Sequence, residues 1–315
     1  MTLDDIISDV VYNKDVHNLL TQPYGEIVQF QIEECVNNGT SIDQEGFQVG
    51  EPFDGDIENA PILFLSSNPA FNFDEVSPRY FAASGKVFKP EHVSVKKRVK
   101  FSDLSKEYSF EDVKKKCTEP QKEMSPDDIK DFLKKRIQIS PARNDEDQTL
   151  RIPLKDGGTV EVPYWACVKN NTESLLPTDL KDTWACLNPS QRAREIMKYA
   201  VCMEIVPFRS SSEIGVNDEL LDKCWIDFTE HLLGLSTASV IVLVGNKVLK
   251  SFVKHIDPKA GKILRDKNIY SCKIGGKNRK IVKVDFAQGQ IRRFENFFDS
   301  SVIEQLQKAV ADALK

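Results

Sequence analysis

Residues 60–74 read APILFLSSNPAFNFD, and this stretch decides the fold. Its apolar run at 62–65 has the length of a strand and stands between turn-forming residues, which is typical of a strand covered on both faces in a parallel sheet. The polar loop that follows would then lie at the carboxyl edge of the sheet, where α/β proteins bind their ligands. Asn68-Pro69 is also a common turn, so the loop has a purely structural interpretation as well.

Length and composition exclude several classes of protein. The chain has 315 residues, 40% of them hydrophobic, and a formal net charge of −5, so it can bury a large core and does not have a disordered composition. Its apolar runs are shorter than a membrane span, and the start MTLDDIISD lacks the basic and apolar regions of a signal peptide. We therefore expect a cytoplasmic protein that does not associate with membranes.

Seven cysteines are scattered along the chain without a CxxC pair. In a reducing compartment such cysteines are thiols, and we expect most of them to pack in the core. The net acidity of the chain argues against broad nucleic-acid binding, although a local basic stripe matters more than the total charge.

Four apolar segments have strand character, and helical segments separate them. The strands are expected at 62–65, 201–206, 239–244 and 280–284, and the later helices at 220–233, 245–252 and from 301 onward. Asn188-Pro189-Ser190 predicts the start of a further helix, and residues 1–36 have helical spacing. This alternation predicts an α/β fold, with three layers, α/β/α, around a four-stranded parallel sheet.

A long segment interrupts this pattern, so we expect three parts in the chain. The N-terminal helices and the first strand occupy 1–76, an inserted α+β subdomain occupies 77–180, and the rest of the core occupies 181–315. Within the insertion, Ser125-Pro126 predicts the start of a helix that runs through 137. Asp156-Gly157-Gly158 predicts the turn of a hairpin between two alternating runs.

The strand ends carry a resemblance to a known family. NPA follows the first strand at 68–70, EIVPFR ends the second at 204–209, VIVLVGNKVLKSF covers the third at 240–252, and a polar loop follows the fourth. This order resembles the uracil-DNA glycosylase superfamily, whose motifs are G-x-N-P-G, T-N-x-V-P, a G-x-x-A turn and H-P-S-P. The resemblance covers 62–80 and 188–314. It implies an enzyme that flips a nucleotide out of double-stranded DNA, hydrolyses the N-glycosidic bond of its base and leaves an abasic site.

The chain also departs from the motifs of that family. Ser66 stands in place of the first glycine, and Ala70 stands in place of the second. The last loop has no histidine, which argues against vigorous uracil excision of the type that relies on that residue. The four-cysteine cluster of the iron–sulfur branch is absent too, so we expect no metal and no cofactor. The histidines lie elsewhere, at His17, His92, His231 and His255.

The resemblance assigns roles to residues of the first and last loops. Asn68 matches the asparagine that positions the attacking water, and its amide can accept from water while it donates elsewhere. Asp74 and Asp285 are rival candidates for polarising that water, and Asp74 has the alternative role of a loop cap. Tyr80 and Phe81 would stack on the flipped base, or they would pack in the core. Substrate contacts are also expected from Ser66, Ser67, Ala70 and Phe71.

Glu204 indicates the class of base. At the matching place the family commonly has an asparagine that reads uracil, whereas a carboxylate has no donor for O4 and accepts instead from an amino group such as cytosine N4. We therefore expect a modified cytosine, hydroxymethylated or glucosylated as in some phage DNA, and a role in antiviral defence. Alternatively, Glu204 pairs with Arg209 or Lys198 and faces away from the base.

DNA contacts are expected from basic and polar residues. Lys96, Lys97 and Arg98 form a basic patch that could meet phosphates, or they form a solvated face. Gln290-Ile291 would fill the gap that a flipped base leaves. Further backbone contacts are expected after the second and fourth strands, from Arg209, Ser210, Ser211, Gln288, Gln290, Arg292 and Arg293.

The sequence therefore predicts a monomeric DNA glycosylase that acts on a modified cytosine. Three alternatives stay open: a uracil repair glycosylase, a non-catalytic nucleic-acid-binding protein on the same fold, and an unrelated nucleotide-processing α/β enzyme. Incubation with modified DNA separates them, because only a glycosylase produces free base and abasic sites.

Overall fold

The computed structural model describes residues 1–10, 52–67, 127, 130–131, 133–134, 151–153, 159–161, 163–207, 217–287, 290–291 and 293–315. The chain forms two compact units, and it passes between them after Pro52, Ser67, Phe132, Met203 and Phe228. The second unit includes 53–67 and the chain from 229 onward, and it contains nearly all of the main sheet.

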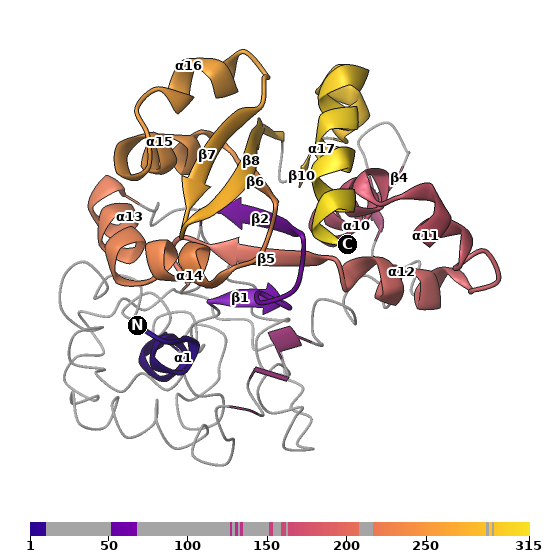
Figure 1. The fold of residues 1–315 in the computed structure, drawn as a ribbon, viewed down its shortest axis with the longest axis horizontal. Coiled ribbons are helices and arrows are strands. Elements are labelled where there is room, and N and C mark those ends of the chain that lie inside the picture. Colours follow the sequence, from indigo (N-terminus) through magenta and orange to yellow (C-terminus); the bar gives the residue numbers. More distant parts are fainter. Residues whose placement is uncertain are drawn as a thin grey trace, which may run out of the picture. The chain divides into compact units, whose positions relative to one another are not determined.

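A six-stranded, mostly parallel sheet forms the centre of the second unit (Figure 1). Its order is β1-β5-β2-β6-β8-β7. β2 pairs with β6 and β6 pairs with β8 in parallel, whereas β1 and β7 run antiparallel to β5 and β8. The predicted α/β class is confirmed. The strands are β1 Phe53–Gly55, β2 Ile62–Ser66, β5 Ala200–Glu204, β6 Val240–Val244, β7 Tyr270–Ile274 and β8 Lys277–Val284.

The four strands that the sequence predicted are the inner four of this sheet, so the predicted number of strands was too low. β7 joins β8 through Gly275 and Gly276, whose φ angles of 57° and 76° favour glycine and suit a two-residue hairpin turn. The sequence did not reveal β7 because its residues are mixed and only Ile274 is buried. β1 is three residues long, which is too short for a periodic pattern.

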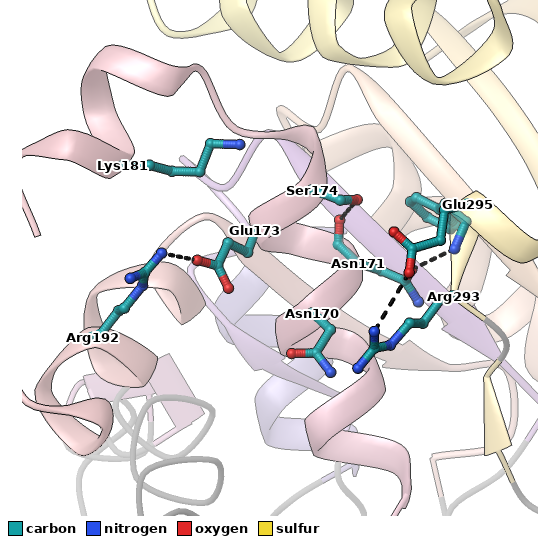
Figure 2. Close-up of a pocket in the computed structure, with 9 residues that line it drawn as sticks. Asn170, Asn171, Glu173, Ser174, Lys181, Arg192, Arg293 and Glu295 are labelled. Atoms are coloured by element: carbon teal, nitrogen blue, oxygen red, sulfur yellow. Dashed lines mark hydrogen bonds and ion pairs between the residues drawn. The ribbon is translucent and has the colours of Figure 1, made fainter. Parts of the chain in front are cut away.

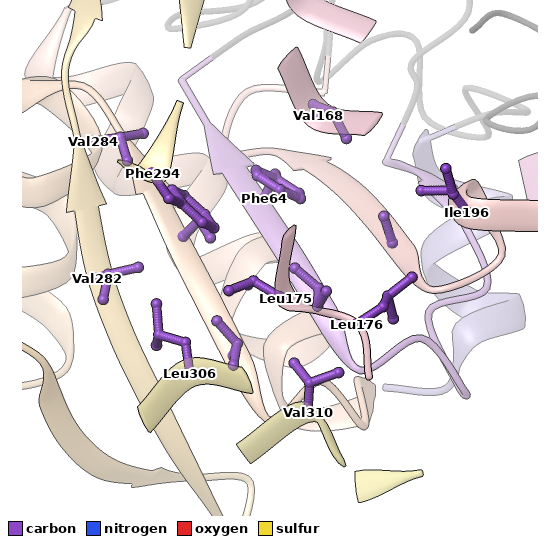
Figure 3. Close-up of a cluster of buried hydrophobic side chains, with 14 of the residues drawn as sticks. Phe64, Val168, Leu175, Leu176, Ile196, Val282, Val284, Phe294, Leu306 and Val310 are labelled. Atoms are coloured by element: carbon purple, nitrogen blue, oxygen red, sulfur yellow. The ribbon is translucent and has the colours of Figure 1, made fainter. Parts of the chain in front are cut away.

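A cluster of buried hydrophobic side chains lies between one face of the sheet and three helices (Figure 3). Val240, Val242 and Val244 of β6 belong to it, because successive side chains of a strand point to opposite faces. Val168 and Leu306 join the same cluster from the helical side. The three helices are α10 Pro163–Leu175, α12 Pro189–Met197 and α17 Ser300–Ala313.

Other helices cover the second face of the sheet. β6 carries Ile241 and Leu243 on this face, and both are buried. α15, Asn246–His255, lies against β6, and α16, Ala260–Arg265, lies against β8. Figure 1 shows these two helices on the side of the sheet opposite to α10, α12 and α17. The second unit thus has helices on both faces of its sheet, as the alternation of strands and helices predicts.

The start of α12 follows the prediction from the sequence. The Asn188 side chain accepts from the Gln191 N–H at 2.8 Å, and the Gln191 side chain accepts from the Asn188 N–H at 3.2 Å. Pro189 takes the first helical position, where a backbone N–H has no partner within the helix, so the missing N–H of proline costs no hydrogen bond. This reciprocal cap fixes the point at which the chain enters α12.

The end of the predicted insertion contributes to the core of the second unit. α10 lies within 77–180, and its Val168 and Leu175 are fully buried. The predicted hairpin is confirmed, since β3, Arg151–Pro153, pairs antiparallel with β4, Thr159–Glu161. The described residues of the predicted helix, 127, 130–131 and 133–134, are helical.

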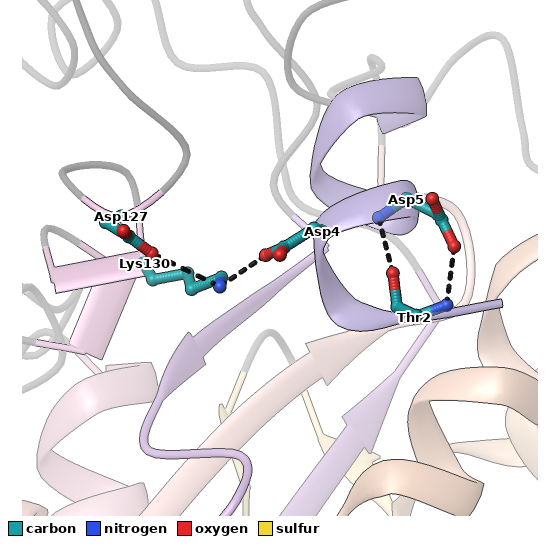
Figure 4. Close-up of polar contacts among 5 residues, drawn as sticks. All are labelled: Thr2, Asp4, Asp5, Asp127 and Lys130. Atoms are coloured by element: carbon teal, nitrogen blue, oxygen red, sulfur yellow. Dashed lines mark hydrogen bonds and ion pairs between the residues drawn. The ribbon is translucent and has the colours of Figure 1, made fainter.

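In the first unit, α1, Leu3–Val10, begins at a reciprocal cap (Figure 4). The Thr2 side chain accepts from the Asp5 N–H at 3.2 Å, and the Asp5 carboxylate accepts from the Thr2 N–H at 2.7 Å. Each side chain therefore satisfies a backbone donor at the start of the helix, where no carbonyl is available for it.

Lys130 links α1 to the helical residues around it. Its ammonium group forms an ion pair with Asp4, and its second partner, Asp127, lies at 3.4 Å (Figure 4). The hydrogen bond to Asp4 is the main cause that raises the pKa of Lys130. Because the Asp4 and Asp127 side chains are mostly exposed, these pairs stabilise the fold only slightly.

The helix predicted at 220–233 is not one continuous α-helix, because a π-helical segment separates two α-helices. Asn217 caps α13, Asp218–Cys224, by accepting from the Leu220 N–H at 2.8 Å. Residues Trp225–Thr229 are π-helical, and α14, Glu230–Leu235, follows them. A π segment has no distinctive composition, so the apolar spacing predicted one continuous helix.

Within the parts of the chain that the structure describes, no helix is both long and apolar enough to cross a membrane.

A hydrogen bond between Tyr270 and Asp257 joins β7 to the loop between α15 and α16. The phenol donates to the carboxylate, which raises the pKa of Tyr270 to about 12 and lowers the pKa of Asp257. Since the folded state holds the phenol proton more tightly, the stabilisation is complete below the ordinary pKa of 10 and is lost as the pH rises toward 12. On the acidic side it is lost as the pH falls through the lowered pKa of Asp257.

Tyr270→Phe is therefore expected to remove one phenol that titrates near pH 12. The measurement is a titration of tyrosinate absorbance for the wild type and the variant, followed by subtraction of the two curves. The difference curve should be centred near pH 12, because the missing phenol is the one that Asp257 protects. A difference curve centred near the ordinary value of 10 would contradict the hydrogen bond.

Candidate functional site

The order of the inner strands identifies a crevice at the carboxyl edge of the sheet. β5 lies on one side of β2, and β6 and β8 lie on the other side. In open α/β sheets, ligands bind where the strand order reverses, outside the carboxyl ends of the two strands concerned. Here those strands are β2 and β6. Ser67 and Gly245, which follow them, therefore mark the candidate site.

Ser66 and Ser67 leave the sheet at this edge. All five residues of β2 are buried, including Ser66 at its end, and Ser67 is half-buried. β2 is hydrogen-bonded to β5 on one side and to β6 on the other. The start of the first loop is thus held in place by the interior of the sheet.

Gly245 turns the chain from β6 directly into α15. Its φ of 90° lies in the region that favours glycine, and its N–H donates to the Val284 carbonyl of β8 at 2.9 Å. A side chain at this position would strain the backbone. The tight turn brings the N-terminal turn of α15, with its partial positive charge, to the candidate site.

Asp285 follows β8 at the same edge and forms an ion pair with Lys283. The Lys283 side chain is 8% exposed, whereas the Asp285 side chain is 44% exposed. One side of the carboxylate therefore meets a buried ammonium group, and the other side is open to solvent. A buried charge needs a partner, so this pair fixes the position of the Asp285 carboxylate.

Sequence reasoning missed Lys283. The available signal was a lysine within the apolar run IVKV at 281–284, near the end of an inner strand. A charged residue in a buried strand requires an opposite charge nearby, and Asp285 is the next residue but one. Asp74, the rival candidate for polarising water, lies outside the described residues.

Glu204 is the last residue of β5 and is partly buried. By its contacts it belongs to the first unit, while the rest of β5 belongs to the second. Lys198, one of the two alternative partners of Glu204, contacts another residue: its ammonium lies 2.7 Å and 2.8 Å from the carboxylate oxygens of Glu195. The other alternative partner, Arg209, lies outside the described residues. A role for Glu204 in reading the base stays a prediction.

The chain after Asp285 forms a small hairpin. β9, Phe286–Ala287, pairs antiparallel with β10, Gln290–Ile291, and β10 lies alongside α10. Gln290-Ile291, which we expected to fill the gap left by a flipped base, is thus the second strand of this hairpin. The hairpin connects the carboxyl edge of β8 to Arg293.

The remaining predicted site residues lie outside the part of the chain that the structure describes, and their roles stay predictions. They belong to the first loop, to the insertion and to the loops after the second and fourth strands: Asn68, Ala70, Phe71, Asp74, Tyr80, Phe81, Lys96, Lys97, Arg98, Arg209, Ser210, Ser211, Gln288 and Arg292.

No protein-family model matches this chain, and no curated protein matches it. The resemblance to glycosylases therefore rests on the residues at the strand ends.

Cysteines and acidic residues show no sign of a metal centre in the described ranges. There, no three histidine, cysteine, aspartate or glutamate side chains gather in a way that could hold a metal ion. The cysteines of these ranges are thiols, namely Cys167, Cys186, Cys202, Cys224 and Cys272.

Proposed function

We propose that this protein is a DNA glycosylase that flips a modified cytosine out of DNA and hydrolyses its N-glycosidic bond. The proposal includes a fold of the uracil-DNA glycosylase type. One observation carries it: the motif-like residues stand at the ends of four inner strands, and the order of these strands reverses between β2 and β6. General rules for α/β sheets expect a ligand at that reversal, which supports the proposal independently of the resemblance.

The reaction requires an activated water and a stabilised sugar cation. The bond between the anomeric carbon and the base nitrogen breaks, its electron pair leaves with the base nitrogen, and positive charge develops on the sugar ring. The base that leaves takes up one proton, which balances the proton that the attacking water gives up. An ionised carboxylate close to that carbon stabilises the charge and accepts a proton from the attacking water. Asp285 would supply this carboxylate, held by Lys283 on its buried side. Asn68 would orient the water, whose oxygen forms the new bond to the anomeric carbon.

Glu204 would select the base. Its carboxylate would accept from the exocyclic amino group of cytosine. Uracil has the O4 oxygen at that position, and O4 and a carboxylate are both acceptors, so they cannot form a hydrogen bond. Uracil is therefore expected to be a poor substrate. Release of ordinary cytosine would damage every genome, so a substituent on the ring must distinguish the substrate. Hydroxymethylated or glucosylated cytosine in phage DNA meets this requirement and implies a role in antiviral defence.

A second candidate is a non-catalytic DNA-binding protein on the same fold. It is favoured by the last loop, because residues 285–293 contain no histidine. His231 lies in α14, and His255 ends α15. On this alternative the chain would bind DNA and release no base.

Incubation with a duplex that contains 5-hydroxymethylcytosine at one position tests the proposal. We expect free base in solution and strand scission at that position after alkali treatment, since abasic sites are alkali-labile. Asp285→Asn keeps the size of the side chain and an acceptor for Lys283, but it cannot take a proton from water. It should slow base release by about 10²–10⁴-fold with little change in duplex binding. Duplex binding by the wild type without base release would leave only the second candidate.

A further inference from the structure

A pocket of about 410 Å³ lies beside α10 in the second unit (Figure 2). It shares no residue with the carboxyl-edge site. Its lining comes from α10, from α11, Thr178–Asp182, from α12, and from the residues that follow β10. Most of the side chains around it are polar or charged.

A buried hydrogen bond builds one wall of this pocket. Asn171 of α10 is only 1% exposed, and its Oδ1 accepts from the Phe294 N–H at 2.8 Å. The Phe294 ring belongs to the core cluster beneath α10. Together these contacts fix the start of the 3₁₀ turn η4, Phe294–Asn296, beside α10. Arg293 and Glu295 on either side of Phe294 then line the pocket, as Figure 2 shows.

Three cations and two carboxylates line the pocket, so its net charge is positive. Glu173 forms an ion pair with Arg192, and Glu295 lies 3.4 Å from Arg293. A guanidinium group has five N–H donors, so one carboxylate contact leaves most of them available.

Two further donors line the same pocket. The Lys181 ammonium and the Asn170 side-chain amide have no hydrogen-bond or ion-pair partner among the residues that the structure describes. Figure 2 shows Asn170 between Glu173 and Arg293, and Lys181 reaching in from the far side of Glu173. The pocket therefore offers cationic and amide donors from four separate segments, namely α10, α11, α12 and the residues after β10.

We propose that this pocket binds a phosphodiester group of the DNA backbone; the choice of DNA as the source of the phosphate rests on the proposed function. Arginine, lysine and asparagine are among the side chains that make most protein contacts to DNA phosphates. The guanidinium fork of Arg293 matches two phosphate oxygens, and Lys181 adds a point charge. A phosphodiester carries one negative charge, which the single net positive charge of the lining balances.

The course of the chain supports a DNA ligand. The β9–β10 hairpin leads from Asp285 at the carboxyl edge to Arg293 at the pocket. Arg293 follows Asp285 by eight residues, which span at most about 28 Å even when fully extended, so one DNA strand can supply both a base to the carboxyl-edge site and a phosphate to the pocket. The pocket is also larger than a single phosphate group needs, so the adjoining sugar can enter with it.

The double variant Lys181→Gln/Arg293→Gln tests this proposal. It removes two positive charges and keeps polar side chains of similar length. The Arg293 side chain is 58% exposed and Lys181 is partly exposed, so the fold is expected to persist. Arg192 is left unchanged because its loss would leave Glu173 without its ion pair. The matched control is Lys308→Gln/Lys315→Gln, which removes two lysines that are each 77% exposed.

Binding of an unmodified duplex is measured by fluorescence anisotropy at several salt concentrations, so that catalysis plays no part. We expect the pocket variant to bind about tenfold more weakly and the slope of log K against log salt to fall by about 1–2. The control variant should match the wild type in both quantities. Equal weakening in both variants would show a general effect of charge and would overturn the proposal.

Inorganic phosphate and a deoxymononucleotide serve as probes for a small ligand, with the melting temperature as readout. If they stabilise the wild type but not the pocket variant while duplex binding is unchanged, the pocket serves a small phosphorylated ligand and the DNA proposal is wrong. No effect of the variant on either readout would identify a solvated charged surface. Base release is assayed separately: pocket-dependent duplex binding without base release would refute the proposed glycosylase and leave the phosphate site in place.

Discussion

Asn68→Ala is expected to slow base release by about 10²–10⁴-fold and to change DNA affinity by no more than a few fold. Asn68 directly follows Ser67 in the sequence, at the point where the chain leaves the carboxyl edge of β2. An amide that orients the attacking water stabilises the transition state and makes no phosphate contact. Its loss should therefore appear in the rate of the chemical step and not in binding.

Single-turnover kinetics and fluorescence anisotropy on the same modified duplex measure these two quantities. Asn72→Ala is the matched control, since it removes the same amide from the same stretch of sequence at a position without a proposed role. The control should release base at close to the wild-type rate. Full activity in Asn68→Ala would remove Asn68 from the mechanism.

Arg279→Ala is expected to lower the free energy of unfolding by about 3–5 kcal/mol. Arg279 lies in β8, is 2% exposed, and donates to the backbone carbonyls of Ser236 and Ala238. Burial lowers its pKa, because the charged form loses its hydration. Truncation would remove a donor from each of two carbonyls and leave a cavity at a buried position. Lys277 would still donate to the Ser236 carbonyl at 3.0 Å, whereas the Ala238 carbonyl would lose its side-chain donor.

Urea denaturation followed by circular dichroism measures the change in free energy. Lys280→Ala is the control, because this neighbour in β8 is only partly buried and its ammonium contacts the Ser271 hydroxyl at 3.0 Å. We expect the control to stay within about 0.5 kcal/mol of the wild type. Arg279→Lys should lose less free energy of unfolding than Arg279→Ala and more than Lys280→Ala, since an ammonium group can reach one of the two carbonyls. A loss below about 1 kcal/mol in Arg279→Ala would contradict a structural role for the guanidinium.

The inner strands could be predicted because burial on both faces leaves a clear pattern. β2 reads ILFLS and β6 reads VIVLV, and every residue of both strands is buried. Such uninterrupted runs do not occur in exposed loops of a stable domain. α16, by contrast, reads AGKILR and is six residues long, so it offers less than two turns of periodicity. The formation of such short elements depends on packing against neighbouring elements, and their own residues show no pattern that predicts it.

The candidate site could be predicted only in part, for a related reason. Asp285 was found because it follows directly after a strand, and the end of a strand is visible in the sequence. The hydrogen bond from Phe294 to Asn171 joins residues 123 positions apart, and no local pattern indicates such a contact. The visible signs of the pocket were Arg293, which was expected to contact the DNA backbone, and Asn170-Asn171 in α10. Asparagines within a helical segment more often face solvent, so the pair carried little information.

The central claim, that the chain releases a modified cytosine from DNA, is tested most directly by the identity of the released base. Identical duplexes would contain uracil, cytosine, 5-hydroxymethylcytosine or its glucosylated form at one position, and mass spectrometry would identify the free base. We expect release of a modified cytosine, little release of uracil and none of cytosine, with Glu204→Gln altering this preference. Efficient release of uracil with none from the modified cytosines would contradict the claim.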